Sequence, residues 1–429
     1  MNKKVFLLMV ITAMTLGTAW AVRGKFGHEQ GAAWAGAIGG LVIILLSGRK
    51  DWYQKVYTAA LAAAIGWGMG GMMSYGRVVG YGRTDDFPNA FYGLLMLFII
   101  GGLYGLTGGG LFGLALAQTK EKKVNWPRLI VEMTIGGFLF YGFFVAQLGW
   151  RMTPPRSELW AGCMGAGLAM VWFLYRNKWT TPLRIALFAM LGGGFGFASG
   201  NFLQIVINSF EINFSGWNLM EYSIGFWGGL GMAYGVFTSE WEKPEKSLSP
   251  APMSSGVALL AVALIIPFIV WQQTFTLEKI TELVNQLDWA NVNAGVYSIW
   301  LIVIGLILVM AVVLYFNFRN TKGLETGRKN VFLCFILLFA VYIIISDIRT
   351  GSYFTWALPE QKLYWVNFVI ILLLTHKVKP LSWKQHKTEF KYINFWILFS
   401  AAIILIAILA LIAIHLHGQL DVSHQRFPL

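Results

Sequence analysis

The chain has 429 residues, of which 57% are hydrophobic and 12% are charged, and its formal net charge is +13. Polar side chains this scarce cannot cover a water-soluble globule, which is therefore excluded. The positive charge does not predict nucleic-acid binding, because most lysine and arginine residues stand in short loops between apolar runs, where they orient a protein in the membrane.

Thirteen apolar runs are long enough to cross about 30 Å of hydrocarbon as helices, and they lack the alternation typical of strands. The expected fold class is an all-α polytopic membrane protein with about thirteen transmembrane helices. The predicted spans are residues 5–22, 31–47, 56–75, 90–117, 129–149, 158–175, 185–208, 220–238, 254–271, 295–315, 331–346, 361–376 and 393–415.

The loops between these runs predict the orientation. With a cytoplasmic N-terminus, 23 of the 33 lysine and arginine residues fall on the cytoplasmic side, as the positive-inside rule favours. An odd number of spans then places the C-terminus outside, in a multi-pass protein of the inner (plasma) membrane. Residues 1–21 resemble a signal peptide, but we interpret them as an uncleaved first span because the end of this run resembles residues 149–151.

The connection after the first span contains two basic residues on the predicted outer side, Arg23 and Lys25, where a membrane protein normally has few. His28 can accept or donate a proton near neutral pH, and a partly buried Glu29 can couple protonation to substrate movement. These adjacent residues point to different sides of a helix, so no metal site is predicted. The alternative interpretation is a salt-bridge cluster at the membrane edge.

The third span contains glycines at every second position, Gly66, Gly68 and Gly70, which bare several sides of the helix. Close packing against neighbouring helices is one interpretation of this pattern. The other is a locally opened helix that lines a cavity, as in transporters with broken spans.

The tripeptide Tyr-Gly-Arg follows this span and recurs six residues later. Arginine offers a planar fork of donors that suits carboxylates and phosphates, and tyrosine offers a ring and a hydroxyl that suit sugars. The candidate binding residues here are Tyr75, Arg77, Tyr81 and Arg83, and the following Asp85 and Asp86 join His28 and Glu29 as candidate acids or bases.

An offset of 126 residues relates residues 1–126 to residues 127–242: the pattern Trp-Ala-Gly-x-x-Gly at 34–39 matches 160–165, and further glycines match without a gap. Each copy contains four predicted spans. Since four is an even number, the two four-helix repeats are expected to be parallel, with a site at their interface.

The second repeat carries a reduced set of candidate binding residues: Arg151, Arg156, Glu158 and Asn201. Asn201 stands where the first repeat has Tyr75, and Leu203 replaces Arg77. The predicted site is therefore asymmetric and lies mainly on the first repeat.

Residues 243–253 form a charged, proline-rich stretch that we interpret as a cytoplasmic linker. Residues 254–429 are rich in isoleucine, leucine and valine and poor in glycine, which predicts a five-helix C-terminal bundle. Residues 277–288 show helical amphipathic spacing, typical of a short helix on the headgroups, with a lid as the alternative.

These features predict an inner-membrane secondary transporter with an outward-facing arginine-rich site for a small polar or anionic organic solute, such as a sugar acid or a phosphorylated sugar. The alternative is a membrane-embedded acyl or glycosyl transferase that uses a lipid-linked donor at the outer face. A third hypothesis is a non-catalytic scaffold. No P-loop, GxSxG or CxxC motif occurs, so no cofactor is expected, and the expected partners are the carbohydrate-like or anionic solute and membrane lipids.

Overall fold

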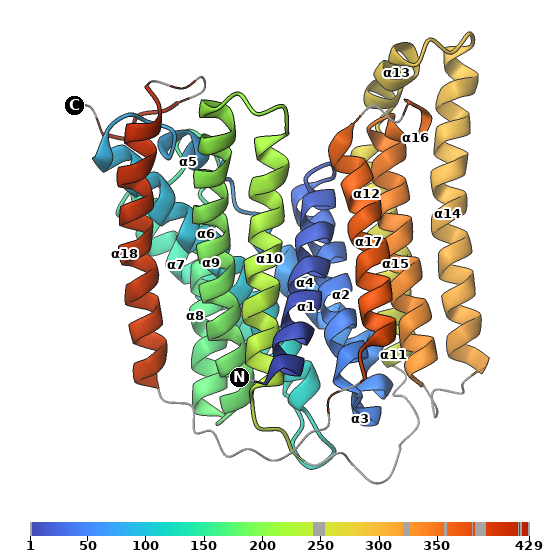
Figure 1. Ribbon diagram of the computed structural model, residues 1–429. Coiled ribbons are helices and arrows are strands. Elements are labelled where there is room, and N and C mark those ends of the chain that lie inside the picture. The colour runs from blue at the N-terminus through green and yellow to red at the C-terminus, as the bar shows by residue number, and fades with distance from the viewer. Residues whose placement is uncertain are drawn as a thin grey trace.

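The computed structural model describes residues 2–242, 254–320, 327–355, 358–379, 381, 392–418, 420 and 423–427, so the predicted linker 243–253 lies outside the described residues. Across these ranges every regular element is a helix (Figure 1). The elements are α1 (Lys3–Arg23), α2 (His28–Ser47), α3 (Lys50–Gln54), α4 (Val56–Gly70), α5 (Gly76–Tyr81), α6 (Phe87–Ala117), α7 (Trp126–Phe140), η1 (Tyr141–Gln147), α8 (Trp160–Arg176), α9 (Thr180–Ser209), α10 (Gly216–Phe237), α11 (Ser254–Leu260), η2 (Ala261–Ile265), α12 (Ile266–Thr274), α13 (Leu277–Gln286), α14 (Val292–Asn320), α15 (Arg328–Arg349), α16 (Ser352–Thr355), α17 (Pro359–Lys377) and α18 (Tyr392–Leu416).

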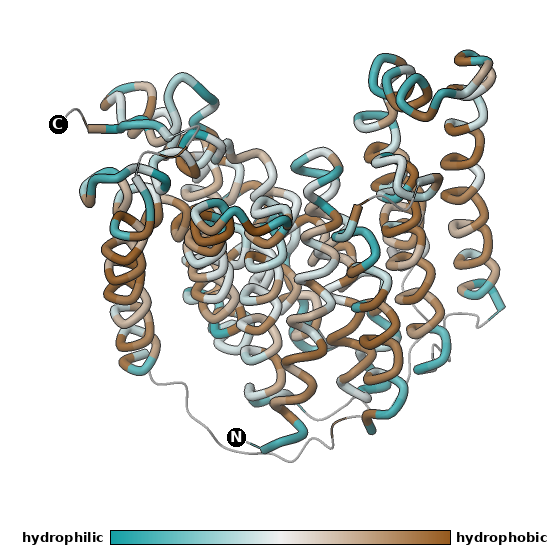
Figure 2. Tube along the Cα trace, turned by 45° about the horizontal axis from the view of Figure 1, so that its top comes forward, coloured by the Kyte–Doolittle hydropathy of each residue, from teal (hydrophilic) through white to brown (hydrophobic). Residues whose placement is uncertain are grey.

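Nine helical segments within the described ranges are long and apolar enough to cross a membrane. They are α1, α2, α6, α7 with η1, α9, α11 through α12, α14, α15 and α18. The other four predicted spans coincide with α4, α8, α10 and α17, so the total of thirteen stays a prediction. The helical membrane class is confirmed, and Figure 2 shows hydrophobic residues along the helices and hydrophilic residues in the turns at both ends.

The two chain ends lie at opposite ends of the bundle (Figure 1), as an odd number of spans requires. The end that carries α5, α13, α16 and the C-terminus is called the upper end below. It corresponds to the predicted outer side, and its orientation in the cell stays a prediction. The amphipathic segment of the sequence forms α13 at this end.

Glycines bring α6, α9 and α10 into direct backbone contact at the centre of the molecule. A Cβ atom on Gly105 would lie 1.9 Å from the carbonyl oxygen of Ala189 on α9, and one on Gly192 would lie 2.1 Å from that of Trp227 on α10. Only a residue without a side chain fits at such distances. Helix α1 packs on α10 and α2 packs on α4, which completes a tight core.

The glycines of the third predicted span serve packing, since α4 is a continuous helix from Val56 to Gly70 and is not opened. A Cβ on Gly66 would meet the backbone of Thr107 at 2.4 Å, and one on Gly70 would meet the ring of Tyr104 at 2.2 Å. One on Gly68 would lie 3.0 Å from a side chain of α2. Each glycine therefore accommodates its own neighbour.

The C-terminal helices lie on two sides of this core. Helices α11, α12, α15 and α17 contact α1, α2 or α4, whereas α18 packs against α6 and α9, and Figure 1 shows α18 apart from α14, α15 and α17. The apolar side chains of Ile406 and Ala410 on α18 pack with Leu94 and Phe98 of α6. Because α18 buries this apolar face against α6, it lies apart from the other four predicted C-terminal helices. The division at residues 126 and 242, and the duplication itself, stay predictions.

Candidate functional site

A buried ion pair joins α1 to α10 near the upper end. Nη1 of Arg23 lies 2.8 Å from Oε2 and 2.9 Å from Oε1 of Glu221, and the two side chains are 2% and 6% exposed. Removing each ion from water costs several kcal/mol, so two such charges persist together only when they pair and form further hydrogen bonds.

The packing of α10 explains why Glu221 points toward α1. Gly225 and Gly229 lie four and eight residues further along the same helix face, and a Cβ on Gly225 would be 2.3 Å from the carbonyl oxygen of Leu16. The hydroxyl of Ser215 accepts the N–H of Asn218 and fixes the start of α10. The glycine face therefore brings α10 onto α1 with the carboxylate beside the last residue of α1.

Two tyrosine hydroxyls also bind this pair. Arg23 donates to the hydroxyl of Tyr75 at 2.9 Å and to that of Tyr104 at 3.3 Å, and Tyr75 donates to Oε1 of Glu221 at 2.9 Å. The guanidinium carbon of Arg23 lies 5.4 Å from the ring centre of Trp20, within cation–π range. Arginine, carboxylate and hydroxyls thus form one network contributed by distant parts of the chain.

His28, the first residue of α2, connects this network to the surface. Its Nδ1 accepts a hydrogen bond from Nη2 of Arg23 at 2.9 Å and lies 3.3 Å from the hydroxyl of Tyr75. The residue is exposed, whereas its partners are buried. Arg23, His28, Tyr75, Tyr104 and Glu221 are called the charged cluster below.

The C-terminal helices close one side of the charged cluster. The hydroxyl of Tyr342 on α15 donates to the carbonyl oxygen of Gly31 at 2.8 Å, and Tyr364 on α17 is hydrogen-bonded to Asn218. Nζ of Lys25 lies 3.6 Å from a carboxylate oxygen of Glu360. Polar contacts therefore link α15 and α17 to the helices that carry the buried pair.

Other sequence-predicted residues gather around residues 423–427, called the C-terminal tail below. Nη1 of Arg77 lies 3.1 Å from Nδ1 of His424, and Arg426 donates to the carbonyl oxygen of Arg151 at 3.0 Å. The side chain of Asn89 accepts the backbone N–H groups of Arg426 and Phe427 at 2.6 and 2.9 Å. The tail thus contacts Arg77 and Arg151, two of the arginines that the sequence predicts to bind the solute.

The remaining candidates are dispersed. Glu158 accepts hydrogen bonds from the backbone of Met152 and Thr153 and from the indole of Trp160, and Asp86 caps α6, so both carboxylates hold local structure.

The other candidates lie apart from one another. Arg156 and Asp85 are exposed and Glu29 is half-buried in the first turn of α2. The ring of Tyr81 lies against Tyr92, Arg83 lies over the ring of Trp217, and the buried Asn201 donates to Gln204.

The structure therefore joins three predicted residues, Arg23, His28 and Tyr75, and adds two that the sequence analysis missed. Glu221 carried a usable signal, because a carboxylate inside a predicted span is rare and marks function by default. Tyr104 carried none, since one tyrosine among apolar residues of a long span is ordinary.

An apolar groove of about 1130 Å³ lies between α4, α6, α7, α8 and α11. Its rim residues Ile65, Ile130, Phe138 and Val257 are exposed on the outside of the bundle, so the groove opens sideways. Its upper end includes Met69, directly before Gly70, against which the ring of Tyr104 packs.

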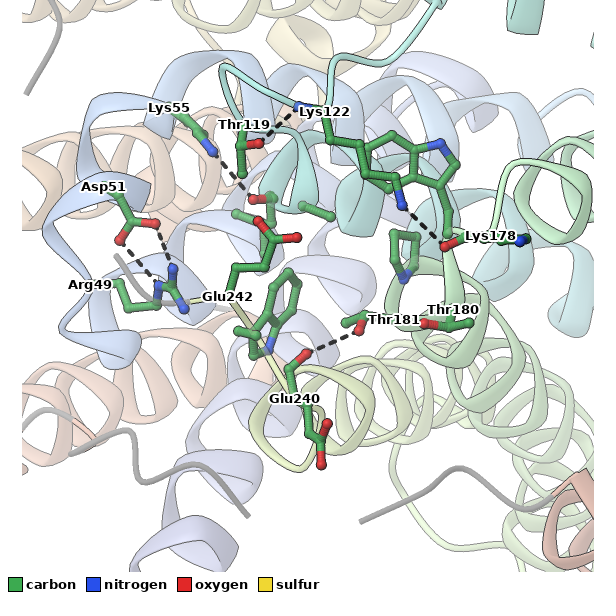
Figure 3. A pocket seen from close by; sticks show the side chains of 15 residues that line it. Arg49, Asp51, Lys55, Thr119, Lys122, Lys178, Thr180, Thr181, Glu240 and Glu242 are labelled. Carbon is green, nitrogen blue, oxygen red and sulfur yellow. Dashed lines mark hydrogen bonds and ion pairs between the residues drawn. The ribbon is translucent and has the colours of Figure 1, made fainter. Parts of the chain in front are cut away.

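A small polar pocket of about 110 Å³ lies at the opposite end of the bundle (Figure 3). Arg49 and Asp51 point toward one another and pair at 2.7 Å, and Nζ of Lys122 donates to the carbonyl oxygen of Lys178 at 3.1 Å. The Lys122 contact joins the connection after α6 to the connection after α8, whereas the Arg49–Asp51 pair is local.

The docked C-terminal tail is expected to loosen in acid. Burial, followed by the charges of Arg77 and Arg83, lowers the pKa of His424, whereas a free tail keeps the usual value of about 6.5. Docking is therefore strongest above that pH and weakens as the pH falls below it. A spin label on Gln425→Cys, an exposed position, should gain mobility between about pH 7.5 and about pH 5.

Both native cysteines are buried and do not compete for the label. Asn89→Ala should free the tail at both pH values, and His424→Gln should remove the pH dependence. If the spectrum of the labelled Gln425→Cys protein without further substitution is the same at both pH values, the assignment is contradicted.

Comparison of the chain with protein-family models, curated proteins and solved structures found no match. The function is therefore inferred from the residues and their geometry.

Proposed function

We propose that the protein is a secondary transporter of a small polar or anionic organic solute and that the charged cluster is its coupling site. The observation that carries this proposal is a fully buried Arg23–Glu221 pair whose only exposed neighbour in the cluster is His28. Paired ionisable groups at membrane depth are costly and mark substrate or proton pathways by default.

The pair supports a simple exchange of partners. When Glu221 takes up a proton, Arg23 loses its counter-charge and can bind the carboxylate or phosphate of a solute. One proton and one negative charge then enter together, so the net charge of the buried site does not change and no uncompensated charge is left in a low dielectric. Tyr75 and Tyr104 supply hydroxyls for a hydroxyl-rich solute.

The groups that face Glu221 come from several elements. Arg23 of α1 and Tyr75 before α5 donate hydrogen bonds to its carboxylate, and Tyr104 of α6 is joined to it through Arg23. Arg23 is the one cation among them, so in the proposed cycle Arg23 is the group that loses its counter-charge when Glu221 is protonated. His28, the exposed member of the charged cluster, would pass a proton from the upper end to the pair.

Uptake into proteoliposomes tests this proposal. Purified protein is reconstituted and supplied with a panel of labelled sugar acids, sugar phosphates and small carboxylates, with and without an imposed pH gradient. We expect at least one anion to accumulate only when the upper side is more acidic. If no labelled anion moves under any proton or cation gradient, the proposal is wrong.

The sideways groove favours a second candidate, an outer-face transferase that uses a lipid-linked donor. Its upper end includes Met69, the residue before the Gly70 that packs against Tyr104, so a chain in the groove would bring its reactive end toward the charged cluster. This candidate predicts a covalently changed acceptor in vesicles that have no gradient. Mass spectrometry of the lipid and solute fractions separates it from transport.

A further inference from the structure

We propose that the groove between α4, α6, α7, α8 and α11 binds an acyl chain of an anionic phospholipid from the surrounding bilayer. This proposal does not depend on the transport proposed above. The groove has a volume of about 1130 Å³. Most small-molecule sites are smaller and measure roughly 300–1,000 Å³.

The lining suits a hydrocarbon chain. It is formed mainly by aliphatic and aromatic side chains, among them Leu61, Leu111, Leu129 and Phe138, together with the flexible methionines Met69 and Met133. Methionine adapts to irregular apolar ligands. A polar ligand would leave its hydrogen-bonding groups unpaired along most of this surface.

The groove is part of the fold and is not a chance gap. A Cβ on Gly165 would lie 2.2 Å from the carbonyl oxygen of Gly136, so α7 is held against α8 by backbone contact and lies apart from α4. A Cβ on Gly162, which lines the groove, would meet nothing within 4 Å. Two π-helical segments, η1 and η2, continue the lining helices α7 and α11, and such segments often occur at functional sites.

The shape favours a chain over a compact ligand. The lining residues on α4 run from Thr58 to Met69 and those on α7 and η1 run from Trp126 to Tyr141. At 1.5 Å per residue these stretches measure about 17 Å and about 23 Å along the helices. The groove therefore extends over more than half of the hydrocarbon thickness of about 30 Å, and its exposed rim opens along this length, where bilayer lipid is the neighbouring medium.

The lower end of the groove matches an anionic headgroup. Gln118 and Trp126 line this end, and the indole of Trp126 donates to the side chain of Gln118 at 3.3 Å. The connection between these two residues carries Lys120, Lys122 and Lys123, of which Lys122 also donates to the carbonyl oxygen of Lys178. Lysines next to a membrane span attract anionic lipids, and tryptophan favours the headgroup level.

Photo-crosslinking tests the proposal. Purified protein is reconstituted with phosphatidylglycerol whose acyl chain carries a diazirine, irradiated, and mapped by peptide mass spectrometry. We expect saturable crosslinks on α4, α7 and α8 at the groove that unlabelled phosphatidylglycerol displaces. Gly162→Leu should reduce them about tenfold, because the added side chain takes up space that the bound acyl chain fills.

A matched control is Gly305→Leu on α14, where an added Cβ also meets nothing within 4 Å but no groove is lined. It should leave the groove crosslinks unchanged. Ile65→Trp, at the exposed rim, provides a second filling variant if Gly162→Leu fails to fold. Crosslinks that are equally strong on the exposed face of α14 and not saturable would overturn the proposal, as would equal displacement by zwitterionic lipid.

Discussion

Arg23→Gln is expected to lower the free energy of unfolding by about 3–5 kcal/mol. The change leaves the carboxylate of Glu221 buried without its counter-charge, and it removes the donor to the hydroxyls of Tyr75 and Tyr104. Breaking one side of a buried pair is costly because the remaining charge stays desolvated. Unfolding of the purified protein by a denaturing detergent, followed by tryptophan fluorescence, measures the loss.

The double variant Arg23→Gln with Glu221→Gln should recover most of this loss, since no unpaired charge then remains. Arg128→Gln is the surface control, because its pair with Glu132 is 57% and 22% exposed and exposed pairs contribute only about 0–1 kcal/mol. If the double variant is less stable than the single one, the stability of this region does not depend on charge pairing.

Glu221→Gln is expected to abolish concentrative uptake in the proposed transport cycle. Glutamine imitates the protonated carboxyl group, so Arg23 stays available to the solute at every pH, but no proton is carried. With a gradient of about one pH unit, one proton per solute supports about tenfold accumulation. The variant should reach only equal concentrations on both sides, while exchange of labelled for unlabelled solute continues.

Glu132→Gln is the matched control, because Glu132 pairs with Arg128 and Arg176 outside the charged cluster. It should keep proton-driven accumulation. Uptake by Glu221→Gln that still responds to the pH gradient would exclude Glu221 as the coupling group, and loss of exchange as well would indicate that the carboxylate is needed for binding.

Local sequence determines the membrane class and the positions of the helices. Hydropathy over about twenty residues decides whether a segment is stable in lipid, and this property needs no knowledge of neighbours. For the same reason the predicted ranges coincide with helices, including the amphipathic α13. Arg23, His28 and Tyr75 were also identifiable, because unusual charge and repeated motifs next to a span are visible in the chain itself.

The partners of these residues were decided only by the tertiary structure. Arg23 meets Glu221 across 198 positions because the glycine face of α10 lies on α1. Arg77 contacts the tail 347 positions later, and α18 leaves the other C-terminal helices to cover α6 and α9. Such pairings depend on which faces of distant helices carry residues small enough for the two backbones to approach closely. Composition and spacing along one segment therefore cannot specify them.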